Sequence, residues 1–211
     1  TPSQVNSLPA SSVVRSVSYF DGLGRPTQSV ATQGSPLQQD IVTPAVYDGF
    51  GREYRKYLPV VLENGGRYKN NLLDASNQYT TTFYNGGAAK VAADVPYSET
   101  KFEFSPLNRV LKQGAPGAVW QPNNTPTDFS DKTIKKVYDV NAASEVYLFN
   151  YNATSGLVSL GAGSLAYYGA GQLTMLKTLD ETNNEVIEYK DKLGHTICKK
   201  VQYGTNAGVK Q

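Results

Sequence analysis

The phrase Asp21-Gly22-Leu23-Gly24-Arg25 occurs a second time as Asp48-Gly49-Phe50-Gly51-Arg52, and an aromatic residue precedes each copy. The aspartate, both glycines and the arginine keep the same offsets, so the chain contains an internal repeat. Weaker copies are Asp180-Glu181-Thr182-Asn183-Asn184, Asp191-Lys192-Leu193-Gly194-His195 and Phe104-Ser105-Pro106-Leu107-Asn108-Arg109. In these copies asparagine replaces the second glycine, histidine replaces the arginine, or serine and asparagine serve as the turn residues.

The chemistry of the phrase predicts the turn of a β-hairpin. An aspartate carboxylate can accept hydrogen bonds from the backbone N–H groups that follow it. Glycine, or asparagine in the weaker copies, can take the positive φ that the turn requires. A short loop containing glycine is the usual connection between antiparallel strands. We therefore expect structural turn roles for Asp21, Gly24, Arg25, Asp48, Gly51, Arg52, Asp191 and Gly194.

The arginines are expected to begin the return strands, where each can pair with its own turn aspartate. We predict an exposed ion pair at each full copy, worth about 0.2–1 kcal/mol. The turn chemistry, rather than this pair, is expected to determine the register of the hairpin.

Alternation around the turns supports strands. Ile187 and Tyr189 share one face before the last turn, and Ile197 and Val201 share one face after it. A single hairpin cannot bury such faces, so hairpins must stack on neighbours. The sequence thus predicts a mostly all-β fold of stacked antiparallel hairpins. One short helix is expected near 72–83, with Asn71 as its N-cap, because apolar residues there fall at helical spacing.

Composition agrees with this fold class and excludes several functions. The chain has 211 residues, among them 15 Tyr, 19 Gly and 11 Pro, which favours a turn-rich β protein. A formal net charge of +2 with 18% charged residues gives no electrostatic reason to expect a nucleic-acid partner. No apolar run approaches the roughly 20 residues of a membrane-spanning helix, so an integral membrane protein is not expected. The single cysteine, Cys198, excludes an internal disulfide.

Changes in composition divide the chain into five parts. We expect a flexible lead-in over 1–12, a β region with repeats and the short helix over 13–120, and a linker over 121–128 rich in proline and asparagine. A second β region follows over 129–204, and a tail over 205–211. The polar start suggests either that a leader has been removed or that the chain is cut from a longer one.

No catalytic, cofactor or metal site emerges from the residue types. His195 is the only histidine and occupies a turn position, so a nucleophile system that depends on it is not expected. A zinc site is not expected with one histidine and one cysteine. The spacing Asp180-x-Thr182-x-Asn184 lacks the remaining ligands of a calcium loop. A pair of carboxylates for glycoside hydrolysis stays open, because their separation is a three-dimensional property.

Aromatic residues offer one alternative function. Trp120 is the only tryptophan and could form a platform for a sugar ring together with Tyr167 and Tyr168. The competing interpretation is an apolar plug at the end of a sheet.

Several longer stretches resemble the amino-terminal region of secreted bacterial Rhs or YD-repeat proteins, most strongly over 17–122. The stretches are Tyr19-Phe20-Asp21-Gly22-Leu23-Gly24-Arg25-Pro26, Asp40-Ile41-Val42-Thr43-Pro44 before Tyr47-Asp48, Tyr57-Leu58-Pro59, Ser105-Pro106-Leu107-Asn108-Arg109, and Gly114-Ala115-Pro116-Gly117 with Trp120. The resemblance implies a large exported or surface chain whose hairpins wind into a spiral sheet that can enclose a toxin. This chain departs from the pattern because weak copies interrupt it and because it is too short for a closed shell.

The resemblance implies a non-catalytic scaffold or interaction module, located outside the bacterial cell or on its surface. Its expected partners are further repeats of the same chain or another protein. The alternative function is a carbohydrate-binding module, since some YD-repeat proteins are linked to carbohydrate binding.

Overall fold

The computed structural model describes residues 8–9, 12–63, 65–70, 72–73, 79–85, 94–206 and 209–210, with only the backbone described at 164–165, 205–206 and 209–210. The expected lead-in over 1–12 lies mostly outside these residues, and the expected tail over 205–211 lies partly outside them.

The described chain forms one large antiparallel sheet of 11 strands, which confirms the predicted fold class. Its strand order is β1-β2-β3-β4-β6-β7-β8-β11-β12-β13, and β5 pairs with β3. Neighbours in the sheet are therefore mostly neighbours in the sequence. The strands are β1 (Arg15–Phe20), β2 (Pro26–Thr32), β3 (Asp40–Tyr47), β4 (Glu53–Tyr57), β5 (Val60–Leu62), β6 (Tyr97–Phe102), β7 (Val110–Gln113), β8 (Ile134–Val140), β11 (Thr174–Leu179), β12 (Glu185–Lys190) and β13 (Thr196–Val201).

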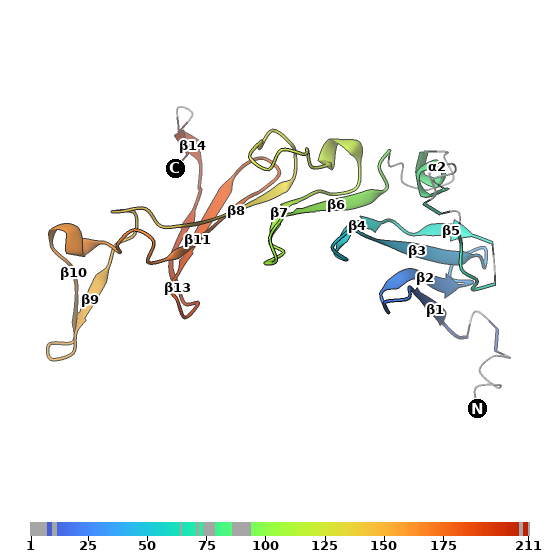
Figure 1. Ribbon diagram of the computed structural model, residues 1–211, viewed down its shortest axis with the longest axis horizontal. Coiled ribbons are helices and arrows are strands. Elements are labelled where there is room, and N and C mark those ends of the chain that lie inside the picture. Colours follow the sequence, from blue (N-terminus) through green and yellow to red (C-terminus); the bar gives the residue numbers. More distant parts are fainter. Residues whose placement is uncertain are drawn as a thin grey trace.

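The sheet is a single elongated layer (Figure 1). Two small hairpins lie outside it: β9 (Phe149–Asn152) pairs with β10 (Leu157–Leu160), and β14 (Thr205–Asn206) pairs with β15 (Val209–Lys210). The accessible surface is 13569 Å². A compact monomer of 22.9 kDa would expose about 9,600 Å². The open shape therefore leaves much more surface exposed than a closed domain of the same mass.

The first apolar core lies where the helix α2 (Tyr79–Asn85) covers strands β2, β3 and β5. Val30, Val42 and Val60 are fully buried there. A helix near 72–83 was expected, but the observed helix begins at Tyr79, and Leu72 lies in a bend. Leu72 is nevertheless buried in the core. The spacing of this apolar residue therefore indicated its burial and not a helical backbone. The expected N-cap, Asn71, lies outside the described residues.

The second apolar core packs around Tyr189 of β12, which is fully buried against Val146 and Leu173. The Tyr189 hydroxyl donates a hydrogen bond to Glu145 Oε1. Burial, followed by this bond to a carboxylate, raises the pKa of Tyr189. This core therefore attaches the segment between β8 and β11 to the face of the sheet.

The connection between β7 and β8 is anchored by a buried lysine. Lys112 Nζ donates to Asn123 Oδ1 (2.7 Å), to the Asp128 carbonyl (2.5 Å) and to Asp131 Oδ2 (2.7 Å). Lys135 Nζ, also buried, donates to the Asp131 carbonyl at 2.6 Å. Lys112 and Lys135 face each other across β7 and β8. The stretch expected as a linker over 121–128 thus lies over a continuous sheet, to which the regions on both of its sides contribute strands.

Candidate functional site

The recurring feature of the sheet is a turn closed by an aspartate. Asp21 Oδ1 accepts the N–H groups of Leu23 and Arg25, each at 2.9 Å. The Gly24 N–H donates to the Asp21 carbonyl at 3.0 Å, and Gly24 has a φ of +78°. Arg25 Nε donates to Asp21 Oδ2 at 2.7 Å. One carboxylate therefore satisfies two backbone donors and positions the arginine.

The second full copy has the same geometry. Asp48 Oδ1 accepts the N–H groups of Phe50 and Arg52 at 2.9 Å, and Gly51 has a φ of +78°. Arg52 Nε donates to Asp48 Oδ2 at 2.8 Å. The side chains of this pair are only 15% and 20% exposed, so the interaction is more buried than the exposed ion pair that the sequence suggested.

The copy that ends in histidine follows the same plan. Asp191 Oδ1 accepts the N–H groups of Leu193 and His195 at 2.9 Å, and Gly194 has a φ of +85°. His195 Nδ1 lies 3.0 Å from Asp191 Oδ2, where the two full copies have an arginine Nε. The imidazole therefore replaces the guanidinium in the turn.

The weakest copies keep the turn with substituted parts. Asp180 Oδ1 accepts the N–H groups of Thr182 and Asn184, and Asn183 takes a φ of +64°. In the remaining copy the carboxylate is Glu103, which receives Arg109 Nε on both oxygens at 2.9 Å. Glu103 was not predicted from the sequence, because this loop is two residues longer and its acid lies before the serine-proline phrase.

Hydrogen bonds in these turns lower the pKa values of the carboxyl groups. The Arg109 side chain, followed by Ser105, lowers the pKa of Glu103 to about 2. The Asn184 side chain, followed by Thr182, lowers the pKa of Asp180 to about 2. Each turn is therefore stabilised by the ionised form of its acid.

The lowered pKa of Glu103 predicts how the stability of the folded chain changes with pH. The pKa of Glu103 is lower in the folded chain than its ordinary value of 4.5. Its stabilising contribution is thus complete above about pH 4.5 and is lost as the pH falls toward 2. An NMR titration of the Glu103 carboxyl carbon should give a midpoint near 2, and Glu103→Gln should flatten the loss of stability in this window. A midpoint near 4.5 would show that the turn does not hold the carboxylate.

Arginines of successive turns stack on aromatic rings of the next hairpin. The Arg25 guanidinium lies 4.6 Å from the centre of the Tyr47 ring, Arg52 lies 4.6 Å from that of Phe102, and Arg109 lies 4.7 Å from that of Tyr138. We call each arginine–ring pair a clasp. The three clasps join β2 to β3, β4 to β6, and β7 to β8.

Strand register explains why the clasps recur. Gln28 pairs with Pro44, and three residues further toward the turn Arg25 comes opposite Tyr47. In the same way, Arg55 pairs with Glu99, and three residues further toward the turn Arg52 comes opposite Phe102. Lys112 pairs with Lys135, and three residues further toward the turn Arg109 comes opposite Tyr138. A clasp is therefore a cross-strand pair at the same position of these three junctions between hairpins. The tips of the hairpins at β1–β2, β3–β4, β6–β7 and β12–β13 all lie along the lower side of the sheet in Figure 1.

A double-mutant cycle measures one clasp. Arg52→Gln and Phe102→Leu should show a coupling energy of about 0.5–1 kcal/mol in urea unfolding, as expected for a partly exposed cation–π pair. Phe20 occupies the equivalent position in β1 but is 61% exposed. The control cycle of Arg52→Gln with Phe20→Leu should therefore give a coupling near zero. Equal coupling in both cycles would argue against a clasp.

The aromatic residues considered for a sugar platform do not lie together. Trp120 is 38% exposed in the 3-10 helix η1 (Ala118–Trp120), and Lys132 Nζ lies 5.8 Å from its ring centre. Tyr167 stacks on Tyr147, with ring centres 4.7 Å apart, and Tyr168 packs on the second core. Figure 1 shows the segment around Trp120 above β6 and the orange segment that carries the tyrosines near β9 and β10. A single platform of all three rings is therefore not assembled.

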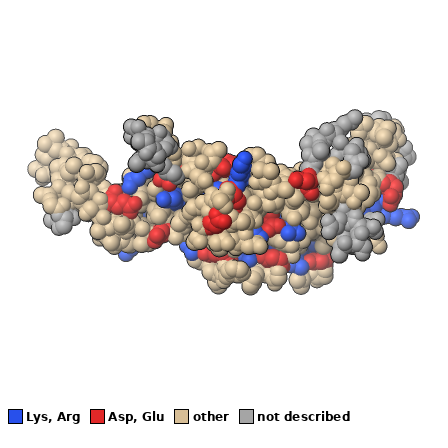
Figure 2. Space-filling model, turned by 90° about the horizontal axis from the view of Figure 1, so that it is seen from above, with Lys and Arg blue, Asp and Glu red and all other residues tan. Residues whose placement is uncertain are grey.

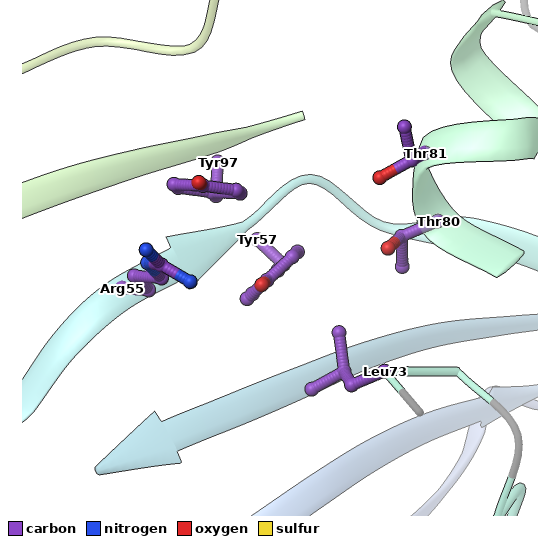
Figure 3. A pocket seen from close by; sticks show the side chains of 6 residues that line it. All are labelled: Arg55, Tyr57, Leu73, Thr80, Thr81 and Tyr97. Atoms are coloured by element: carbon purple, nitrogen blue, oxygen red, sulfur yellow. The ribbon is translucent and has the colours of Figure 1, made fainter. Parts of the chain in front are cut away.

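One pocket lies between the helix α2 and strands β4 and β6 (Figure 3). Its volume is about 190 Å³, and its lining residues are Arg55, Tyr57, Leu73, Thr80, Thr81 and Tyr97. The only charged group in the lining is Arg55, whose Nε donates to Glu99 Oε2 at 2.7 Å and whose guanidinium stacks on Tyr97 at 4.5 Å. The cation is thus engaged within the sheet rather than directed at a ligand.

An insertion interrupts the hairpin of β8 and β11. The Asn141 N–H donates to the Leu173 carbonyl at 3.1 Å, and the Leu173 N–H donates to Asn141 Oδ1 at 2.8 Å. In the first aspartate turn, the Asp21 N–H likewise donates to the Arg25 carbonyl, and the Arg25 N–H donates to Asp21 Oδ1. Asn141 therefore closes a turn of the same kind, in which residues 142–172 replace the short tip. Asn141 was not predicted from the sequence, because its hydrogen-bond partner Leu173 lies 32 residues away.

The inserted segment contains the exposed hairpin β9–β10. Phe149 pairs with Leu160 and Tyr151 with Val158, so one face of the hairpin is entirely apolar. Each of these four side chains is more than half exposed. Residues 146–176 contain no charged residue, and Figure 2 shows this end of the molecule without blue or red atoms.

Within the described residues, no cluster of three histidine, cysteine, aspartate or glutamate side chains could hold a metal ion. In the same part of the chain, no helix is long and apolar enough to cross a bilayer.

Comparison with known proteins assigns the part of the chain that contains three of the five acid-closed turns to one family. The family described as "Domain of unknown function (DUF6443)" matches residues 1–133. The chain belongs to this family. The DUF6443 region contains the turns closed by Asp21, Asp48 and Glu103 and ends just before β8, so the third clasp joins Arg109 inside it to Tyr138 beyond it. No curated protein and no solved structure matches the chain.

Proposed function

We propose that the chain is a non-catalytic scaffold segment of a larger exported bacterial protein of the Rhs or YD-repeat type. Its role is structural. Hairpins of one kind are joined edge to edge, and the sheet that they form continues into neighbouring β structure. Further repeats, in the same polypeptide or in another protein, are its partners.

The observation that carries this proposal is the repetition of one turn along one sheet. A carboxylate closes five hairpins, an aspartate in four of them and Glu103 in the fifth. The same cross-strand clasp joins three successive junctions. Such an arrangement can be lengthened without any new interaction, which is the property of a repeat scaffold.

The open shape supports the same function. Among the described residues, β1 and β13 are the two end strands of a single layer, and their outer edges offer main-chain groups to further strands. The exposed apolar face of β9–β10 adds a surface of the kind that interaction sites use. Both features suit a segment that works inside a larger assembly.

The proposal predicts the size and the location of the native polypeptide. An antiserum raised against these 211 residues should detect, in the bacterium that makes the protein, a chain much larger than 22.9 kDa. The signal should lie in the culture medium or on the cell surface, with a cytoplasmic enzyme as the fractionation control. A cytoplasmic polypeptide of about the size of this chain would contradict the proposal.

A further inference from the structure

The two lysines that face each other across β7 and β8 are buried beside too little negative charge. Lys112 is 1% exposed, and Lys135 is 0% exposed. Among the described residues, Asp131 is the only carboxylate within 4.0 Å of either ammonium group, and it lies 2.7 Å from Lys112 and 3.5 Å from Lys135. One carboxylate cannot neutralise two ammonium ions, and an uncompensated buried charge is costly. The sheet therefore holds a surplus positive charge at this point.

Lys135 is the lysine that carries the surplus. Lys112 has the short ion pair with Asp131, whereas Lys135 Nζ is bound mainly by uncharged oxygens. It donates to the main-chain carbonyls of Asp131 and Thr133, at 2.6 and 3.1 Å, and to Asn183 Oδ1 at 3.0 Å. The amine is thus shielded from water and in contact with a side-chain amide.

Asn183 supplies this amide from the turn between β11 and β12. Its φ is +64°, and both full copies of the repeat have a glycine of positive φ at the same position. Glycine would satisfy the turn, but asparagine adds a carboxamide whose Oδ1 accepts from Lys135 and whose Nδ2 donates to the Phe129 carbonyl at 3.2 Å. The carboxamide is therefore held beside the buried amine by contacts outside its own turn.

We propose that Lys135 and Asn183 join in an intramolecular amide bond, which forms once in each folded chain without an added enzyme. A C=O bond is about 1.2 Å long, so Lys135 Nζ, 3.0 Å from Oδ1, lies at most about 4.2 Å from Asn183 Cγ. Rotation of the carboxamide brings the two atoms into the range for attack. Groups held together in this way react as if at very high concentration.

The reaction expels ammonium and needs no co-reactant. Asp131 Oδ1 accepts a proton from the Lys135 ammonium group, and the free amine attacks Asn183 Cγ. The Nζ–Cγ bond forms, the Cγ–Nδ2 bond breaks, and Nδ2 leaves as an ammonium ion that takes two protons from Nζ, one of them by way of Asp131. Asp131 is again a carboxylate, paired with Lys112. The ammonium ion carries the surplus charge away, so the product is electrically balanced.

The bond links β8 directly to the turn after β11. It closes a covalent loop of residues 135–183, which contains β11 and the whole insertion of 142–172. A cross-link over such an interval stabilises a fold by restricting the unfolded chain. The inference does not rest on the proposed scaffold function, although a covalent link suits a segment with a structural role.

Mass spectrometry of the intact, folded 211-residue chain tests the proposal. We expect a mass about 17 Da below that of the sequence, which is the mass of ammonia, and a branched tryptic peptide that joins Lys135 to residues 178–190. Asn183→Gly supplies the glycine of the other turns and should have its full mass with the fold kept, as judged by circular dichroism. Lys135→Met is a second variant that should have its full mass. Asn123→Ala, which removes the amide beside Lys112, is the control and should keep the deficit.

Several results would overturn the inference. They are the full sequence mass in the unmodified folded chain, a deficit that persists in both Asn183→Gly and Lys135→Met, and a branched peptide that joins Lys112 to Asn123 instead. Loss of ammonia without any branch would show that an asparagine has cyclised onto its own main chain, and it would equally contradict the cross-link. The proposed scaffold function would stand in each case, because its turns and clasps are non-covalent.

Discussion

Replacement of Asp131 by alanine should lower the free energy of unfolding by about 3–5 kcal/mol, because it leaves a buried cation without its carboxylate. Lys112 is 1% exposed, and its ammonium lies 2.7 Å from Asp131 Oδ2. Burial disfavours the charged acid, but hydrogen bonds from Lys112 and Thr133 outweigh it and lower the pKa of Asp131. Urea unfolding monitored by circular dichroism measures the loss.

Asp128→Ala is the matched control. Its main-chain carbonyl accepts a hydrogen bond from Lys112, and alanine retains this carbonyl. The Asp128 side chain is exposed and accepts hydrogen bonds from Ser130. A change within about 0.5 kcal/mol is expected, as for an ordinary surface position. Equal losses in the two variants would show that the connection over 121–133 is not anchored by this network.

Gly51→Val should destabilise the chain by about 2–3 kcal/mol. Gly51 has a φ of +78°, which costs an L-residue about 1–2 kcal/mol, and a branched side chain adds to this. The added Cβ would also lie 3.0 Å from Arg25 Nη1, a group of the first clasp. Thermal and urea unfolding should both show the effect.

Gly49→Val tests the same turn without the strain. Gly49 has no positive φ, and an added Cβ would meet no atom within 4 Å. A small change is expected for this variant. If both substitutions were tolerated equally, the turn would not depend on the left-handed conformation of Gly51.

The hairpin turns could be predicted from sequence because their chemistry is local. An aspartate and a glycine three residues later carry both hydrogen bonds and the positive φ, and even the copy with Asn183 in place of glycine keeps the turn. Strand alternation then led to the correct fold class. These signals act over a few residues and do not require knowledge of distant partners.

The parts that could not be predicted depend on distant residues. Asn141 closes its turn with Leu173, and no spacing rule connects them. The clasps require the register between hairpins, which the sequence of one hairpin does not contain. Leu72 had helical spacing but lies before the helix, since its burial satisfied the same apolar pattern without a helical backbone.

Hydrogen–deuterium exchange at β13 tests the central claim most directly. In the 211-residue chain, the outward-facing amides of 196–201 should exchange fast, because no strand among the described residues pairs with the outer edge of β13. In the native polypeptide purified from its bacterium, the same amides should exchange slowly, because a further strand covers them. Equally fast exchange in both would contradict a sheet that continues beyond this segment.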